Sequence, residues 1–85
     1  MTFQVVIHDD VRKKIKKIPK NYQENIVNKL SALSEFPHFL DIKKIKGQPN
    51  TYRLRIGNYR AIFDVNFENK IIYITALNTR GKTEY

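Results

Sequence analysis

Four of the five arginines of this chain lie in its second half, and their spacing suits the binding of a phosphate group. Arg53 and Arg55 are two residues apart, so on a β-strand they would project from the same side. Arg60 follows a Gly-Asn pair typical of a hairpin turn, and Arg80 follows the last apolar run. A guanidinium is always protonated, and its planar fork matches phosphate oxygens, so a phosphate site is the economical explanation for the group. Taken singly, Arg53 and Arg55 have an alternative interpretation as outward-facing charged residues that protect an edge strand from aggregation.

One aromatic and several lysines extend this candidate site. Tyr85, if it lies near a phosphate, can stack on an RNA base or take part in proton transfer. A frayed chain end is the alternative interpretation of this tyrosine. The predicted phosphate-binding residues that accompany Arg53 and Arg55 are Lys43, Lys44, Lys46 and Lys82.

Other catalytic schemes find no support in the pattern. His8 and His38 are far apart in sequence, and neither has the spacing of a metal ligand or of a nucleophile's base. Asp64 and Glu68 form no obvious pair, and no glycine-rich loop precedes a helix. We therefore expect neither a metal nor a cofactor.

The charge balance indicates a polyanionic partner. Sixteen lysines and arginines stand against eight acids, a net charge of +8 on 85 residues. Nucleic acid is the first candidate partner, an acidic protein the second and a membrane surface the third, while a merely solubilising surface is the alternative. No stretch approaches the roughly 20 apolar residues of a membrane span. The absence of cysteine fits a reducing compartment, so a cytoplasmic location is expected.

The first half of the chain predicts one strand and two helices. Alternating apolar residues indicate a strand over residues 2–8. Asp9 and Asp10 then supply an N-cap and first-turn acids for a helix that Pro19 ends. Helical spacing resumes after this proline and stops at Pro37, which predicts a helical hairpin.

The second half predicts a meander. Residues 39–46 are basic and show no regular spacing of apolar residues, so they are expected to be irregular. Period-two alternation then indicates three strands, over residues 52–56, 59–65 and 70–77. The resulting order, β-α-α-β-β-β, most simply packs both helices on one face of a mainly antiparallel four-stranded sheet. This is an α+β fold in one domain, residues 1–85, with the place of the first strand left open.

Three stretches of the chain resemble the RelE/ParE superfamily of toxins from type II toxin-antitoxin systems. They are residues 43–47 (Lys-Lys-Ile-Lys-Gly), residues 52–60 (Tyr-Arg-Leu-Arg-Ile-Gly-Asn-Tyr-Arg) and residues 78–82 (Asn-Thr-Arg-Gly-Lys) with the terminal tyrosine. The resemblance covers essentially the whole chain, and the second stretch is its most specific part. It points to the RelE branch, whose members cut messenger RNA in the ribosomal A site.

The resemblance implies a role for each matching residue. Arg60 would contact the scissile phosphate, Arg80 would stabilise the transition state and protonate the leaving oxygen, and Tyr85 would stack on the substrate. The two strand arginines stand where that branch often has lysines, and arginine cannot serve as a general base. In a metal-free attack, a general base must take the proton of the 2′-hydroxyl. Four candidates for this base remain: Tyr85, Glu84, a ribosomal group and solvent.

The resulting hypothesis is a toxin that cleaves messenger RNA on the ribosome, with ribosome and messenger as partners and no cofactor. Its cognate antitoxin is expected to carry an acidic segment, because burying several guanidiniums without counter-charges is costly. Two alternatives stay open. One is a ParE-like inhibitor of DNA gyrase without nuclease activity, and the other is a catalytically silent RNA-binding domain.

Overall fold

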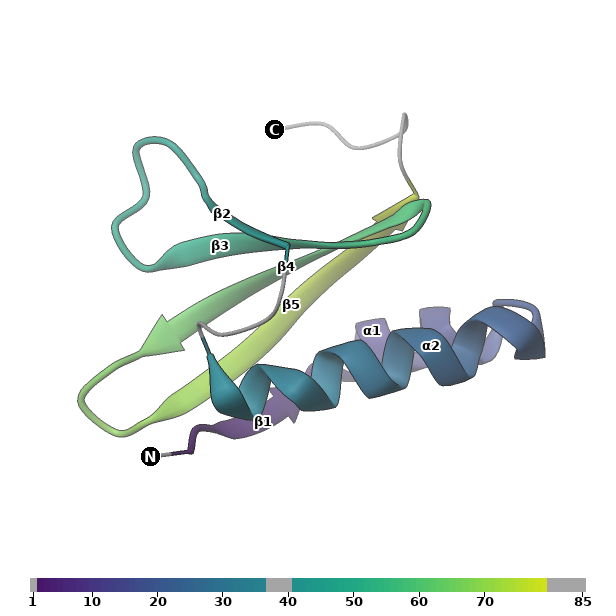
Figure 1. Ribbon diagram of the computed structural model, residues 1–85, viewed down its shortest axis with the longest axis horizontal. Helices are drawn as coiled ribbons and strands as arrows, with labels where there is room; N and C mark the ends of the chain where they lie inside the picture. The colour runs from purple at the N-terminus through teal and green to yellow at the C-terminus, as the bar shows by residue number, and fades with distance from the viewer. Residues whose placement is uncertain (1, 37–40, 80–85) are drawn as a thin grey trace.

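The computed structural model describes residues 2–36 and 41–79 and shows helices on one side of a twisted sheet (Figure 1). The elements in chain order are β1 (Gln4–Ile7), α1 (Asp9–Lys16), α2 (Lys20–Ser31), the 3-10 turn η1 (Ala32–Glu35), β2 (Ile42–Lys44), β3 (Thr51–Ile56), β4 (Tyr59–Asn66) and β5 (Ile71–Thr79). The predicted α+β class, with both helices against one face of a mainly antiparallel sheet, is confirmed.

The sheet has five strands, in the order β1-β5-β4-β3-β2, so the prediction of four strands is wrong. The added strand, β2, lies within the segment that was expected to be irregular. Its three residues are too few and too polar to show an alternating pattern, and pairing with β3 holds them in place. The first strand lies at the opposite edge and pairs parallel with β5, while the other pairings are antiparallel.

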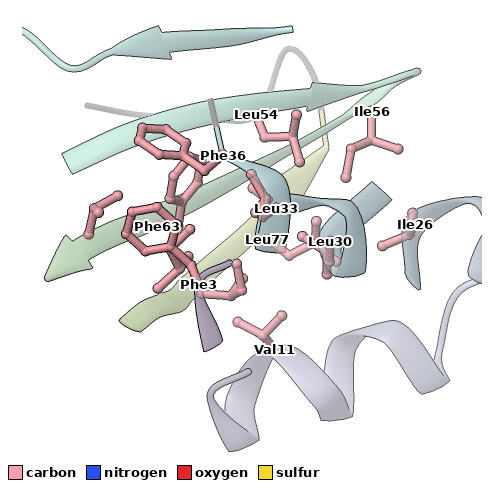
Figure 2. Packing of buried hydrophobic residues seen from close by; sticks show 14 of the residues in the cluster. Phe3, Val11, Ile26, Leu30, Leu33, Phe36, Leu54, Ile56, Phe63 and Leu77 are labelled. Atoms are coloured by element: carbon pink, nitrogen blue, oxygen red, sulfur yellow. The ribbon is translucent and has the colours of Figure 1, made fainter. Parts of the chain in front are cut away.

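One hydrophobic core fills the space between the helices and the sheet (Figure 2). Apolar residues at helical spacing on α1 and α2 meet the inward residues of β3, β4 and β5, which alternate with outward ones. Phe36 packs edge-on against Phe3, Tyr52 and Phe63, with ring centroids 5.2–5.9 Å apart. Burying each large apolar side chain contributes about 1.5–3 kcal/mol, so this layer stabilises the sheet that carries the arginines.

The helix ends differ slightly from expectation. Asp9 was predicted as an N-cap, but α1 begins at this residue and His8 occupies the N-cap without a side-chain hydrogen bond. Asp9 and Asp10 do lie in the first turn, where acids interact favourably with the helix dipole. The helix ends at Lys16, and Pro19 is the N-cap of α2. Neither helix within the described ranges is long and apolar enough to span a bilayer.

Two features of the hairpins fix the positions of the polar residues. The predicted turn between β3 and β4 is present, and Gly57 has a φ of 57°, a conformation that glycine adopts without steric cost. This turn places Arg55 directly opposite Arg60. The last strand runs to Thr79, two residues beyond the prediction, because Asn78 pairs with Arg60 and prolongs the ladder.

Candidate nucleic-acid interface

The face of the sheet turned away from the helices, here called the open face, carries the predicted strand arginines. Along β3 the buried residues alternate with Arg53 and Arg55, so the prediction that both arginines share one side is confirmed. Arg60 lies on the same side, because it is the pairing partner of Arg55. The residues of the open face are Gln4, Val6, Lys43, Thr51, Arg53, Arg55, Arg60, Ile62, Asp64, Asn66, Ile71, Tyr73, Ala76 and Asn78.

Four residues from four strands or strand ends form one line across the open face, here called the arginine row. Asp41 precedes β2 and its carbonyl accepts the Arg55 backbone N–H at 3.0 Å, which extends the ladder by one residue. Arg55 lies opposite Arg60, and Arg60 lies opposite Asn78, whose side-chain oxygen at this sheet edge accepts a 3.4 Å hydrogen bond from Lys14 of α1. Opposed residues in antiparallel strands have Cα atoms about 4.5–5.5 Å apart, so both guanidiniums can reach a single phosphate. Like charges directly opposite one another are destabilising, so the row favours a counter-ion.

Part of that counter-charge comes from within the chain. The Asp41 carboxylate Oδ2 is 2.8 Å from Nε of Arg55, and the two side chains are 49% and 53% exposed. Such an exposed ion pair contributes about 0–1 kcal/mol to stability. Within residues 2–36 and 41–79, neither Arg53 nor Arg60 has an acidic partner of this kind. Their charges are therefore available to an anion from outside the chain.

A second line of residues lies beside the arginine row. Lys43 pairs with Arg53, and Arg53 pairs with Ile62. Lys44 pairs with Tyr52, so its side chain leaves the strand on the other side. A depression of about 410 Å³ is lined by Lys43, Lys44, Ile45, Lys46, Gln48 and Arg53. Strands β2 and β3 and the loop between them thus place four of the predicted phosphate-binding residues around one hollow.

The other end of the open face has a different character. Thr51 donates a hydrogen bond of 2.6 Å to Oδ1 of Asp64, an acid for which the sequence suggested no partner. Tyr73 lies opposite Asp64 and is 42% exposed. Tyr52 and Tyr59 pack against the core. Among the described residues, the charged side chains of the open face therefore lie on or beside β2, β3 and β4, and its residues on β5 and β1 are uncharged.

The predicted residues Arg80, Lys82 and Tyr85 lie outside the described residues, as do His38 and Glu84. The sequence missed Asp41, because its pairing depends on the register of β2, a strand too short to predict. An acid placed before a short basic run is the only signal that the sequence offers for it. Within the described ranges, no three His, Asp or Glu side chains gather as metal ligands. The chemistry that this surface offers is the binding and charge stabilisation of an anion by guanidinium and ammonium groups.

Known protein families identify the family to which this chain belongs. The family model described as "ParE toxin of type II toxin-antitoxin system, parDE" matches residues 5–83. The chain belongs to the RelE/ParE superfamily of toxins. Toxin RelE3 of Methanocaldococcus jannaschii is 41% identical over 75 residues, which cover 88% of this chain and 76% of the relative. The resemblance inferred from the arginine-rich hairpin is therefore confirmed.

Solved structures agree with this assignment. The RelE–RelB complex of Pyrococcus horikoshii OT3 matches with a TM-score of 0.83 and 33% identity, covering 98% of this toxin and 100% of the matched chain. The RelB–RelE complex of Methanococcus jannaschii matches with a TM-score of 0.69 and 28% identity, covering 87% and 88%. The family model carries the ParE name and these relatives carry the RelE name. The relatives favour the RelE branch, and both names denote toxins of toxin-antitoxin systems.

Proposed function

We propose that this toxin is a ribosome-associated endoribonuclease that cleaves messenger RNA and so inhibits translation in the cytoplasm. The observation that carries the proposal is the arginine row, in which Arg55 and Arg60 lie opposite each other on the open face. Arg53 and Lys43 lie beside the row, so cations continue along the surface. A single RNA strand can follow such a line of cations through its phosphates.

In the proposed reaction the 2′-oxygen of a ribose attacks the adjacent phosphorus, and the bond from phosphorus to the 5′-oxygen breaks. The products are a 2′,3′-cyclic phosphate and a 5′-hydroxyl. The attacking hydroxyl gives its proton to a base, and the departing oxygen takes one up. Arg60 and Arg55 hold the phosphate in line and stabilise the charge that grows on it, and each well-placed donor contributes about 2.7–4 kcal/mol.

The resemblance assigns the remaining steps to the end of the chain. Arg80 protonates the departing oxygen, and Tyr85 stacks on the substrate. The strand arginines cannot be the general base, because they do not lose a proton at physiological pH. The remaining candidates for the base are Tyr85, Glu84, a ribosomal group and solvent.

We further propose that a cognate antitoxin with an acidic segment neutralises this toxin. The matched toxin of Pyrococcus horikoshii is in complex with RelB, which supports a protein partner for the present chain. The acidic character follows from the net charge of +8 and from Arg53 and Arg60, which have no acidic partner in the part of the chain that the structure describes. Guanidiniums covered by a partner without counter-charges would lose hydration at a cost of several kcal/mol per ion.

One observation favours a second candidate function. The family model that matches residues 5–83 is described as a ParE toxin. A ParE-like toxin of the same fold would inhibit DNA gyrase by binding protein and would leave messenger RNA intact. The arginine row is compatible with this candidate, but binding a protein does not require it.

A cell-free translation reaction tests the proposal. Purified toxin is added, and the ends of the messenger RNA are mapped by primer extension. We expect cuts in phase with codons for the wild-type toxin and none for Arg60→Ala. Arg12→Ala is the matched control, because this arginine is exposed on α1 and donates a hydrogen bond to the Ile7 carbonyl. It should cut like the wild type.

The other outcomes contradict the proposal in different ways. Intact message together with gyrase-dependent cleavage of DNA, measured on a plasmid with purified gyrase, would support the ParE-like candidate. Binding to ribosomes or RNA without cuts would support a catalytically silent domain. Loss of cutting in Arg12→Ala as strongly as in Arg60→Ala would mean that general charge, not the arginine row, drives the activity.

A further inference from the structure

The ion pair of Asp41 with Arg55 lies at one end of the arginine row and has no role in the chemistry outlined above. Two contacts join these residues. The backbone N–H of Arg55 donates to the Asp41 carbonyl at 3.0 Å, and Nε of Arg55 lies 2.8 Å from Oδ2 of the carboxylate. Backbone and side chain of the arginine are therefore both held by one residue.

The atom that Asp41 contacts is informative. A guanidinium has five N–H donors in a fixed plane, one on Nε and four on the two terminal nitrogens. The described contact uses Nε. The edge formed by the two terminal nitrogens points away from Nε, and this edge can bind a phosphate in the two-pronged manner. The carboxylate thus fixes the arginine from its side without occupying the edge that binds the anion.

The position of Arg60 gives this contact a further consequence. Because Arg60 lies opposite Arg55, the two positive side chains repel each other and tend to swing apart. Asp41 lies on the far side of Arg55 from Arg60, at the β2 end of the same row. A free arginine side chain has about 2 kcal/mol of rotamer entropy, part of which is lost when it binds an anion. A carboxylate that already holds the side chain lowers that loss.

We propose that Asp41 is a positioning residue that holds Arg55 ready for the RNA phosphate. The inference rests on the proposed function, because it names how that same site is organised. Two other roles for this acid make opposite predictions. As a competing anion it would weaken RNA binding, and as the general base it would control the cleavage rate without changing affinity.

Two variants with equal charge separate these roles. Asp41→Asn and Asp41→Ala both remove one negative charge, but the asparagine keeps an oxygen that accepts the Nε–H bond. The probe is a single-stranded RNA oligonucleotide with 2′-O-methyl groups, which binds but cannot be cleaved. Charge alone makes both variants bind this RNA more tightly than the wild type. Asp64→Asn is the matched control, because it removes an acid from the same face while its amide oxygen still accepts from Thr51.

Positioning predicts a difference between the two variants. We expect Asp41→Ala to bind the oligonucleotide about two- to fivefold more weakly than Asp41→Asn, the range that exposed ion pairs span in measured cycles. We expect Asp41→Asn to match the small gain of Asp64→Asn. A second readout is the ¹⁵N-resolved NMR signal of the Arg55 Nε–H. It should stay resolved in the wild type and in Asp41→Asn, and it should broaden in Asp41→Ala.

Each remaining outcome overturns the inference. Equal affinity of the two Asp41 variants, both tighter than the wild type, would make this acid a competing anion. Unchanged affinity with cleavage lost in both variants, and with the acidic limb of the pH–rate profile gone, would make it the base. If the wild type leaves message intact in the translation reaction and binds the oligonucleotide no better than Arg60→Ala, the proposed function fails and the inference fails with it. If the wild type binds but the two variants are equal, only the inference fails.

Discussion

The two faces of the sheet come from the same strands but depend on different physics. On the helix-covered face, β3, β4 and β5 contribute a continuous layer of buried apolar residues. On the open face, the alternate residues of the same strands are cations, one hydrogen-bonded acid, other polar groups and a few partly exposed apolar side chains. The covered face holds the molecule together, and the open face carries the chemistry that we propose.

The two faces differ in what their sequence must specify. Burial of apolar area is not directional, so the covered face requires only that apolar residues recur with the right period. The effect of a charge depends on which residue stands opposite it, so the open face depends on strand register. Mutations should therefore affect stability on one face and activity on the other.

The largest effect on stability should come from the covered face. Phe63 is fully buried and packs against Phe36 and Tyr52. We expect Phe63→Ala to lower the free energy of unfolding by about 3–5 kcal/mol, because it removes a large apolar side chain and leaves a cavity. Denaturant unfolding measures this. Tyr73→Ala, on the open face of β5, is the control and should cost only about 0.5 kcal/mol or less. Equal losses of unfolding free energy in the two variants would contradict the proposed difference between the faces.

The next largest effect should appear in activity alone. Arg60→Ala should lower the rate of messenger cleavage by a factor of about 10²–10³, the usual loss for one preorganised donor to transition-state charge. Its stability should stay the same or rise slightly, because a cation opposite Arg55 is removed. Single-turnover cleavage and unfolding measured on the same sample check this. A fall in stability that accounts for the lost activity would contradict it.

The residues of the covered face were predicted well from the sequence, because burial follows from local patterns of apolar residues. The helical spacing of Val11 and Ile15 on α1, and the alternation along β3 and β4, reflect burial that local pattern reveals. The sequence also placed Arg53 and Arg55 on one side, since period two is a local property. Element boundaries were less certain, and the last strand runs two residues further than its apolar pattern.

What the sequence could not supply is pairing between segments distant in the chain. The strand β2 has three residues and no period, so neither its existence nor its partner could be predicted. Asp41 became part of the site only through that pairing. The parallel contact of β1 with β5 has the same origin, because a strand's own residues do not say which edge it joins. Register depends on two strands together, whereas a pattern of residue types describes only the strand in which it occurs.

A smaller effect should follow from the turn that couples the two central strands. Gly57 has a φ of 57°, and a Cβ added there would meet no atom within 4 Å. The cost of Gly57→Ala is therefore purely conformational, and we expect about 1–2 kcal/mol of lost stability. Thermal unfolding measures it, with Glu68→Ala in the exposed turn after β4 as control. A loss near zero would mean that the turn adapts, and Arg55 would then lose its fixed place opposite Arg60.

The smallest effect should belong to the lysines that border the arginine row. Lys43 lies opposite Arg53 and is exposed, so we expect it to contribute one phosphate contact without directing the chemistry. Lys43→Ala should reduce the slope of log affinity against log salt by about 0.7, the value for one contact to a single strand. Lys29→Ala removes the same charge from α2, in the helix layer, and should leave the slope unchanged. Titration of an RNA oligonucleotide at several salt concentrations measures both. Equal changes in the two variants would show that net charge sets RNA affinity, whereas a change confined to Lys43→Ala localises the phosphate track to the open face.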